Sequence, residues 1–252
     1  MISFTFLLWV IITLVYVATL LLTAGPNNGL NEYVFLGPDL GTLHKWGALD
    51  AYEIRYNYQI WRLFTSLILS IGFSYYCISS GCLLVIGFIV ETKRMSPYRM
   101  AILFFGSGIL GNLFSICVES EVSVGPMTGI MAWTSALISG IIVNWKLLAG
   151  AGMIRICLIF MCVMLFVVLL CLSISYDADY DFRQISLTAE AGGFMAGFGM
   201  GMMLMPHALQ RDNKFVKLVR KIGFAITVVY MAILFPVFYC SVEPRATRWV
   251  GA

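Results

Sequence analysis

The apolar residues of this chain fall into long runs that short polar stretches separate. Seven runs come close to the roughly 20 residues that a helix needs to cross a bilayer. They cover residues 2–22, 63–90, 100–118, 127–143, 153–173, 186–205 and 222–239. The connection over residues 23–61 mixes glycine and proline with aromatic residues, a composition typical of a segment that lies in the membrane interface. The pattern predicts an all-α, polytopic membrane protein.

Composition agrees with this fold class. The chain has 252 residues, of which 60% are hydrophobic and 12% charged, more apolar surface than one water-soluble core can bury. We expect a six-helix membrane core over residues 1–206, a basic connecting segment over 207–221, and a seventh transmembrane helix with a tail over 222–252. The first run could instead be a signal peptide, because small residues follow it. Its length and the lack of a preceding basic region favour a span.

Basic residues gather in the loops on one side of these spans. They are Lys93, Arg94, Arg99, Lys146, Arg155, Arg211, Lys214, Lys217, Arg220 and Lys221. The short loops on the other side are mainly acidic. The positive-inside rule therefore predicts that the N-terminus faces the cytosol or matrix and that the C-terminus lies on the opposite side. Topology accounts for the net charge of +3, and without a nucleic-acid motif we expect no nucleic-acid partner.

Few residues offer chemistry inside the apolar runs. Most of the seven cysteines lie within the runs, without a C-x-x-C pair and far from both His44 and His207, so we expect packing thiols and neither a metal site nor a cofactor. Glu190 is the exception. A carboxylate within a span is energetically expensive and calls for a structural or functional reason.

Several motifs then point to a family. They are WRLFTS from Trp61, GFIVE ending at Glu91, SGILGN over 107–112, SVGPMTGIMAW over 123–133 and AEAGGFMAG over 189–197. In their order and spacing, over residues 59–201, they resemble the rhomboid intramembrane proteases. The resemblance implies a rhomboid-like six-helix bundle, here followed by a seventh C-terminal transmembrane helix.

Two sets of residues match structural features of that family. Arg62 and Glu91 both lie near predicted helix ends and could pair. In the family the matching residues brace the long loop after the first helix. The alternative is two separate interfacial charges. A glycine stripe recurs every four residues in the sixth predicted span, at Gly193, Gly197 and Gly201. Such a stripe lets a neighbouring backbone approach closely. We expect it to face the fourth span near Gly129.

The residues at the family's catalytic positions differ from the family's pattern. Rhomboids attack with a serine in G-x-S-G and use a histidine of the sixth helix as base. Aligned from Gly125, Met127 occupies the serine position, and a shift of one residue places Thr128 there instead. Glu190 replaces the histidine.

The second span differs in the same way. Tyr75 and Ser79 stand where the family has its oxyanion-stabilising histidine and asparagine. The resemblance implies that these positions converge, with Glu190 either neutral or hydrogen-bonded to Tyr75, Ser79 or Thr128. We therefore expect no enzyme activity.

Inactive relatives in this superfamily bind membrane clients, so the resemblance implies a pseudoprotease that acts as a membrane scaffold. The alternative is a structural subunit of a large complex, in the mitochondrial inner membrane or in the secretory pathway. In either case we expect lipid and other integral membrane proteins as partners, in a hetero-oligomeric complex. A residual protease using Thr128 and Glu190 is disfavoured, because a carboxylate is a weak base for a hydroxyl group. A channel or transporter would need paired intramembrane charges.

Overall fold

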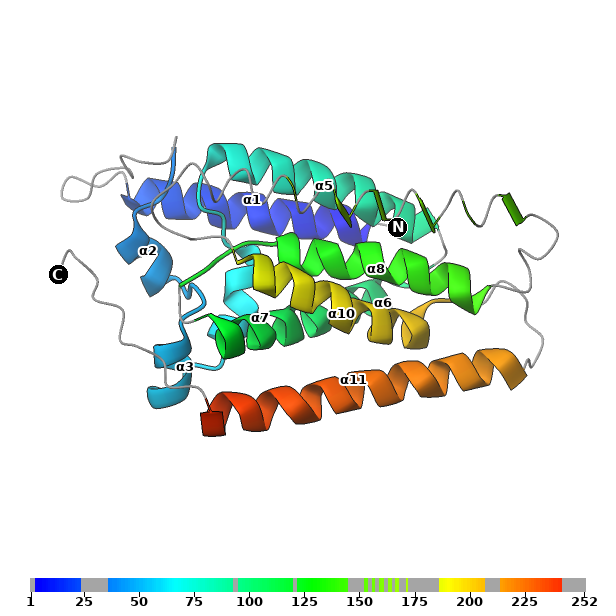
Figure 1. Ribbon diagram of the computed structural model, residues 1–252. Coiled ribbons are helices and arrows are strands. Elements are labelled where there is room, and N and C mark those ends of the chain that lie inside the picture. The colour runs from blue at the N-terminus through cyan, green and yellow to red at the C-terminus, as the bar shows by residue number, and fades with distance from the viewer. Residues whose placement is uncertain are drawn as a thin grey trace.

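The fold is a bundle of helices with one end covered by short helices (Figure 1). The computed structural model describes residues 3–23, 36–92, 95–119, 122–144, 186–206 and 214–241, with scattered residues between 152 and 171. The long elements are α1 (Phe4–Thr23), α5 (Phe73–Thr92), α7 (Ser107–Val118), α8 (Met127–Val143), α10 (Leu187–Leu204) and α11 (Lys214–Ser241). The short helices α2 (Leu40–Lys45) and α3 (Ala51–Tyr56) cover one end.

The predicted class of an all-α, polytopic membrane protein is confirmed. Four of the described helices are long and apolar enough to cross a membrane: Phe4–Thr23, Phe73–Thr92, Pro97–Val118 and Lys214–Cys240. The helix α8 is apolar but shorter. The helix α1 begins at one end of the bundle and α11 finishes at the other, where α2 and α3 lie (Figure 1).

The second predicted span, over residues 63–90, is not one helix. It consists of α4 (Arg62–Thr65), a 3₁₀ turn η1 (Ser66–Ile68), a non-helical break and then α5. Other elements satisfy carbonyl groups on the N-terminal side of the break. The Asn112 side chain donates to the Leu63 carbonyl at 2.9 Å, and the Gly125 amide donates to the Ser66 carbonyl at 2.9 Å. The helix can therefore be interrupted without leaving these buried groups unpaired.

Three other predicted segments differ from the structure or fall partly outside it. The fifth span, 153–173, lies mostly outside the described residues, although the Phe166 ring packs on Phe194 of α10 with 4.2 Å between centroids. Residues 207–213 of the expected connecting segment are also outside them. Residues 214–221 form the first turns of α11 rather than a connection, because their amphipathic sequence continues the helix. Within the expected loop 23–61, residues 36–61 include α2 and α3.

The third span carries an irregular helical segment. Here α6 (Pro97–Ala101) continues through a π-helical stretch, η2 (Ile102–Gly106), into α7. The Trp133 indole of α8 donates to the Met100 carbonyl at 3.3 Å, which satisfies this group next to the bulge. Phe104 of the bulge fills the space beside Gly129, where an added Cβ would lie 2.5 Å from the Phe104 ring. Gly129 therefore faces Phe104 and not the glycine stripe.

The glycine stripe of α10 faces α8. A Cβ added to Gly197 would lie 2.5 Å from the Ala132 Cα, and one added to Gly201 would lie 2.8 Å from the Ala136 Cα. A Cβ added to Gly193 would likewise collide with the main-chain oxygen of Thr128. The two backbones are thus in direct contact along the stripe, which positions the first turn of α10 against the start of α8.

Candidate functional site

A small polar cavity lies between α5, α7, α8 and α10. Its volume is about 10 Å³, the room of roughly one water molecule. The side chains around it include Ser66, Tyr75, Asn112, Met127, Thr128 and Glu190. The loop before α8 also contributes, and its Ser123 forms an antiparallel bridge with Leu49 of the segment that covers this end of the bundle.

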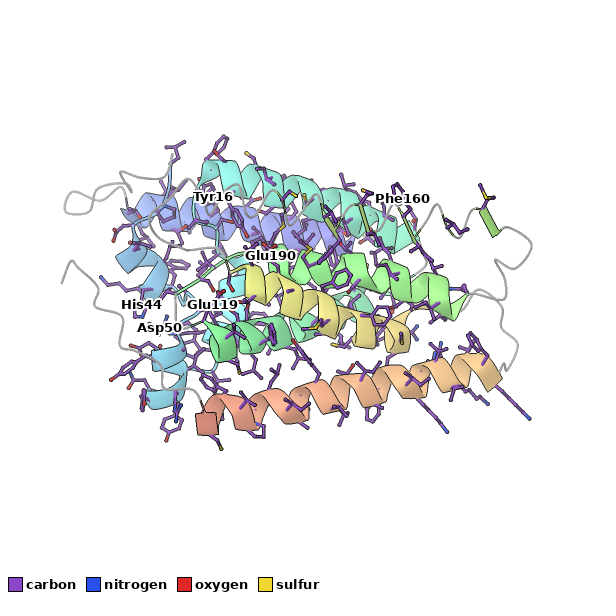
Figure 2. The ribbon with its side chains drawn as sticks, in the orientation of Figure 1. Tyr16, His44, Asp50, Glu119, Phe160 and Glu190 are labelled. Atoms are coloured by element: carbon purple, nitrogen blue, oxygen red, sulfur yellow. The ribbon has the colours of Figure 1, made fainter. Side chains whose placement is uncertain are left out.

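Glu190 reaches the cavity from the first turn of α10 and is 1% exposed (Figure 2). A carboxylate in this turn interacts favourably with the positive end of the helix dipole. Ser186 caps the helix, since its hydroxyl accepts from the Ala189 amide at 3.0 Å. The Ser186 hydroxyl also lies 2.5 Å from that of Ser115 and donates to Glu119 at 3.2 Å. Ser115, Glu119 and Ser186 therefore form one connected hydrogen-bonded cluster at the start of α10.

Tyr75 enters the cavity from α5 because Gly125 makes room for it. Gly125 has a φ of 147°, a conformation that side chains with a Cβ rarely adopt. A Cβ at this position would also collide with the Tyr75 hydroxyl. The glycine in the loop before α8 is thus needed for both backbone conformation and space.

The two residues at the start of α8 contribute little chemistry. Met127 is buried and presents a thioether, which is not a nucleophile for acyl transfer. The Thr128 methyl group is enclosed by two glycines, because a Cβ added to Gly111 or Gly193 would lie 2.6 or 2.8 Å from it. Tyr75, Met127, Thr128 and Glu190 thus line one space.

Ser79 differs from the expectation. It is fully buried on α5, but the cavity does not extend to it, and its hydroxyl donates to the Tyr76 carbonyl at 3.2 Å. A space of one water molecule is too small to reach a second helical turn from Tyr75.

The proposed pairing of Arg62 with Glu91 is wrong. Arg62 donates to the main-chain oxygens of His44 at 2.8 Å and Ala48 at 2.9 Å, and to the Gln59 side chain at 2.7 Å. It therefore braces the segment that carries α2 and α3, as the resemblance implied. Burial lowers the pKa of the Arg62 guanidinium, with the nearby acidic side chains acting in the opposite direction.

Glu91 lies at the other end of α5, about 30 Å of helix from the break that follows Arg62. Both of its oxygens accept from the Ser3 hydroxyl at 2.8 Å, and one accepts from the Thr5 amide and hydroxyl at 3.0 Å. Glu91 thus satisfies donors at the start of α1. The two charged residues hold different ends of the bundle.

Sequence reasoning missed the arrangement at the covered end. His44 Nε2 lies 3.2 Å from an Asp50 carboxylate oxygen, and Asp50 also caps α3 (Figure 2). Their spacing of six residues would put them on different faces of one helix, so no helical pattern marks the pair. His44 belongs to α2, outside the cavity lining, and His207 lies outside the described residues. Within the described ranges, no three His, Cys, Asp or Glu side chains gather as a metal site.

The Rhomboid domain family model matches residues 57–207, more than half of the chain. The chain therefore belongs to the rhomboid family. This range contains the motifs noted in the sequence and every residue described here as lining the cavity.

Curated relatives come from Arabidopsis thaliana. The chain is 33% identical to "Inactive RHOMBOID-like protein 8" over 47% of this chain and 34% of the relative. It is 30% identical to "RHOMBOID-like protein 5" over 70% of this chain and 54% of the relative. It is 25% identical to "RHOMBOID-like protein 6, mitochondrial" over 70% of this chain and 54% of the relative. The chain thus spans between about a third and a half of the length of these relatives.

Proposed function

We propose that this rhomboid-family protein is a non-catalytic membrane scaffold that binds other transmembrane proteins. The cavity carries the proposal. At the meeting point of α8 and α10, where the family resemblance puts nucleophile and base, the chain has Met127, Thr128 and Glu190 around the space of one water molecule. None of these three residues is the serine or the histidine that the family's mechanism uses at these positions.

Two of the serine side chains at the cavity already make structural hydrogen bonds. The Ser66 hydroxyl accepts from Asn112 at 2.9 Å, and Ser186 caps α10. Glu190 is the carboxylate that could act as a base here, and a carboxylate takes a proton from a hydroxyl poorly. These contacts support a structural role for the polar cluster. The name of one relative, "Inactive RHOMBOID-like protein 8", also supports a non-catalytic role.

The apolar outer faces of α1, α5 and α11 are the surfaces on which lipid and partner helices would lie. Large side chains such as Leu14, Val85 and Phe224 are more than half exposed there. We further propose that the N-terminus faces the cytosol or matrix. The basic first turns of α11 lie at the same end of the bundle as the beginning of α1, which supports this orientation (Figure 1).

The alternative function is that of a fixed subunit in a large membrane complex. One relative's name places that protein in mitochondria, which favours the inner mitochondrial membrane as the compartment to test first. Both functions predict a hetero-oligomer and differ in stoichiometry. A client-binding scaffold exchanges its partners, whereas a structural subunit keeps the same ones in fixed ratio.

Affinity purification in a mild detergent, followed by native mass spectrometry, tests both. We expect the chain to be recovered with other integral membrane proteins. Sub-stoichiometric, exchangeable partners would support the scaffold, and one fixed complex would support the subunit. Recovery of the chain with lipid alone, under conditions that preserve a known complex of the same membrane, would contradict both.

A further inference from the structure

A groove interrupts the interface between α10 and α11. Its volume is about 400 Å³. Phe194, Met195 and Phe198 line it from α10, and Ile226, Thr227 and Tyr230 from α11. These positions lie in the middle of the membrane-spanning part of α11.

The helix α11 is closely packed on both sides of the groove. On one side Gly223 meets α10, where an added Cβ would lie 2.6 Å from the Met202 Cβ and 2.7 Å from the Gly199 oxygen. On the other side Leu234 and Phe238 of α11 are buried in a cluster with residues of α7 and α3. The groove therefore lies along α11 between two closely packed regions.

The lining offers almost no polar group to an occupant. The Thr227 hydroxyl donates to the Gly223 carbonyl at 2.9 Å, and the Tyr230 hydroxyl donates to the Gly192 carbonyl at 3.4 Å. The remaining side chains are hydrocarbon, aromatic rings and a thioether. Water would lack hydrogen-bond partners in such a space, and an empty gap of this size is rare in a packed protein. Hydrocarbon is the chemistry that fits.

A flexible chain fits this groove better than a partner helix. Helices associate closely in membranes through small residues. The most exposed lining residues are instead large, since Met195 and Ile226 are 45% and 39% exposed. They would hold a second backbone away, whereas an acyl chain can pass between them.

Charge at the end of α11 points to the headgroup. Lys214, Arg220 and Lys221 are exposed in its first turns. Ile226 lies five residues beyond Lys221, about 8 Å deeper along the helix. Basic side chains at this depth attract anionic lipid phosphates. We propose that the groove between α10 and α11 binds one acyl chain of an anionic phospholipid whose phosphate lies at the basic end of α11, a site independent of the scaffold function.

The test reconstitutes the full chain in bilayers of equal parts phosphatidylglycerol and phosphatidylcholine, extracts it in mild detergent and measures retained lipid by native mass spectrometry. We expect one retained phosphatidylglycerol. Ile226→Trp fills the groove from α11, and Met195→Trp fills it from α10, so each should reduce retention several-fold. The matched control is Val229→Trp, which enlarges an exposed residue of α11 outside the groove lining and should retain the lipid.

Thermal unfolding in the same detergent shows whether each variant is folded. Two groove variants are used so that the test still stands if one of them does not fold. Equal retention in folded Ile226→Trp, Met195→Trp and wild type would overturn the site. Equal retention of the two lipids by wild type would overturn the assignment of an anionic headgroup. A dimer of this chain that only the groove variants abolish would show that a second copy occupies the groove, and would also overturn the proposal.

Discussion

Replacement of Gly197 by leucine should destabilise the bundle, because this residue marks the closest approach of α10 to α8. The new Cβ would lie 2.5 Å from both the Ala132 Cα and the Ser135 hydroxyl oxygen, and 2.6 Å from the Ala132 oxygen. Carbon atoms pack best about 3.5–4.0 Å apart, so the helices would have to separate by roughly 1 Å. Two of the three obstructing atoms belong to the backbone and cannot rotate away.

The expected loss of stability follows from this geometry. Overpacking costs about 1–3 kcal/mol, and we expect the upper end because separation also loosens the contacts of Gly193 and Gly201 on the same face. Equilibrium unfolding in mixed micelles of a mild detergent and dodecyl sulfate, followed by tryptophan fluorescence, measures the change. A shift of about 3 kcal/mol would reduce the ratio of folded to unfolded protein by roughly 100-fold.

Gly81→Leu is the matched control. Gly81 lies in α5, and an added Cβ there meets nothing within 4 Å. The same chemical change should be neutral or slightly stabilising, since leucine favours helix over glycine by up to about 1 kcal/mol. If Gly197→Leu were as stable as wild type and as Gly81→Leu, the direct backbone contact between α8 and α10 would be refuted.

Three further outcomes are expected. Arg62→Gln should increase amide exchange over residues 36–56, because hydrogen bonds from a charged donor contribute about 1.5–3 kcal/mol each; unchanged exchange would show that Arg62 does not brace this segment. Glu190→Gln keeps the shape of a neutral carboxyl group, so it should preserve folding and any complex that the wild type forms if Glu190 is neutral; dissociation of the complex while the variant remains folded would show that the charge is required. Tags at the two termini should be digested from opposite faces of sealed vesicles, with the N-terminal tag on the cytosolic or matrix side; digestion of both from one face would contradict the proposed topology.

The parts of the fold that periodicity controls could be predicted. The glycine stripe was visible because helices in membranes approach through small residues, and α10 indeed presents it to α8. The residues of α8 that meet the stripe could not be predicted, because the sequence does not tell which face of α8 lies against α10. The stripe does lie near Gly129, since Gly193 meets the main chain of the adjacent Thr128, but Gly129 itself faces Phe104, and Thr128, Ala132 and Ala136 meet the stripe.

The break before α5 could not be seen in the sequence, because residues 63–72 carry no charge and no proline, and their only polar side chains are the small hydroxyls of Thr65, Ser66 and Ser70. It depends on donors from distant elements, the Asn112 side chain and the Gly125 amide. The pairing of Arg62 with Glu91 is excluded by helix length alone, since the 20 residues of α5 keep the two side chains apart.

The candidate site was partly readable as well. Glu190 stood out because a carboxylate in a span needs support. The serine cluster at the start of α10 could not be predicted, because Ser115 and Ser186 are 71 residues apart and meet only in the folded chain.

Activity-based labelling tests the central claim that the cavity has no catalytic nucleophile. Purified protein in bilayers would be incubated with a fluorophosphonate probe, which reacts with activated hydroxyl groups, and a catalytically active rhomboid would be treated in parallel. The account predicts labelling of the active enzyme and none of this chain. Labelling of Thr128 that disappears in a folded Glu190→Gln variant would show that the pair forms a working nucleophile and base, and would contradict the account.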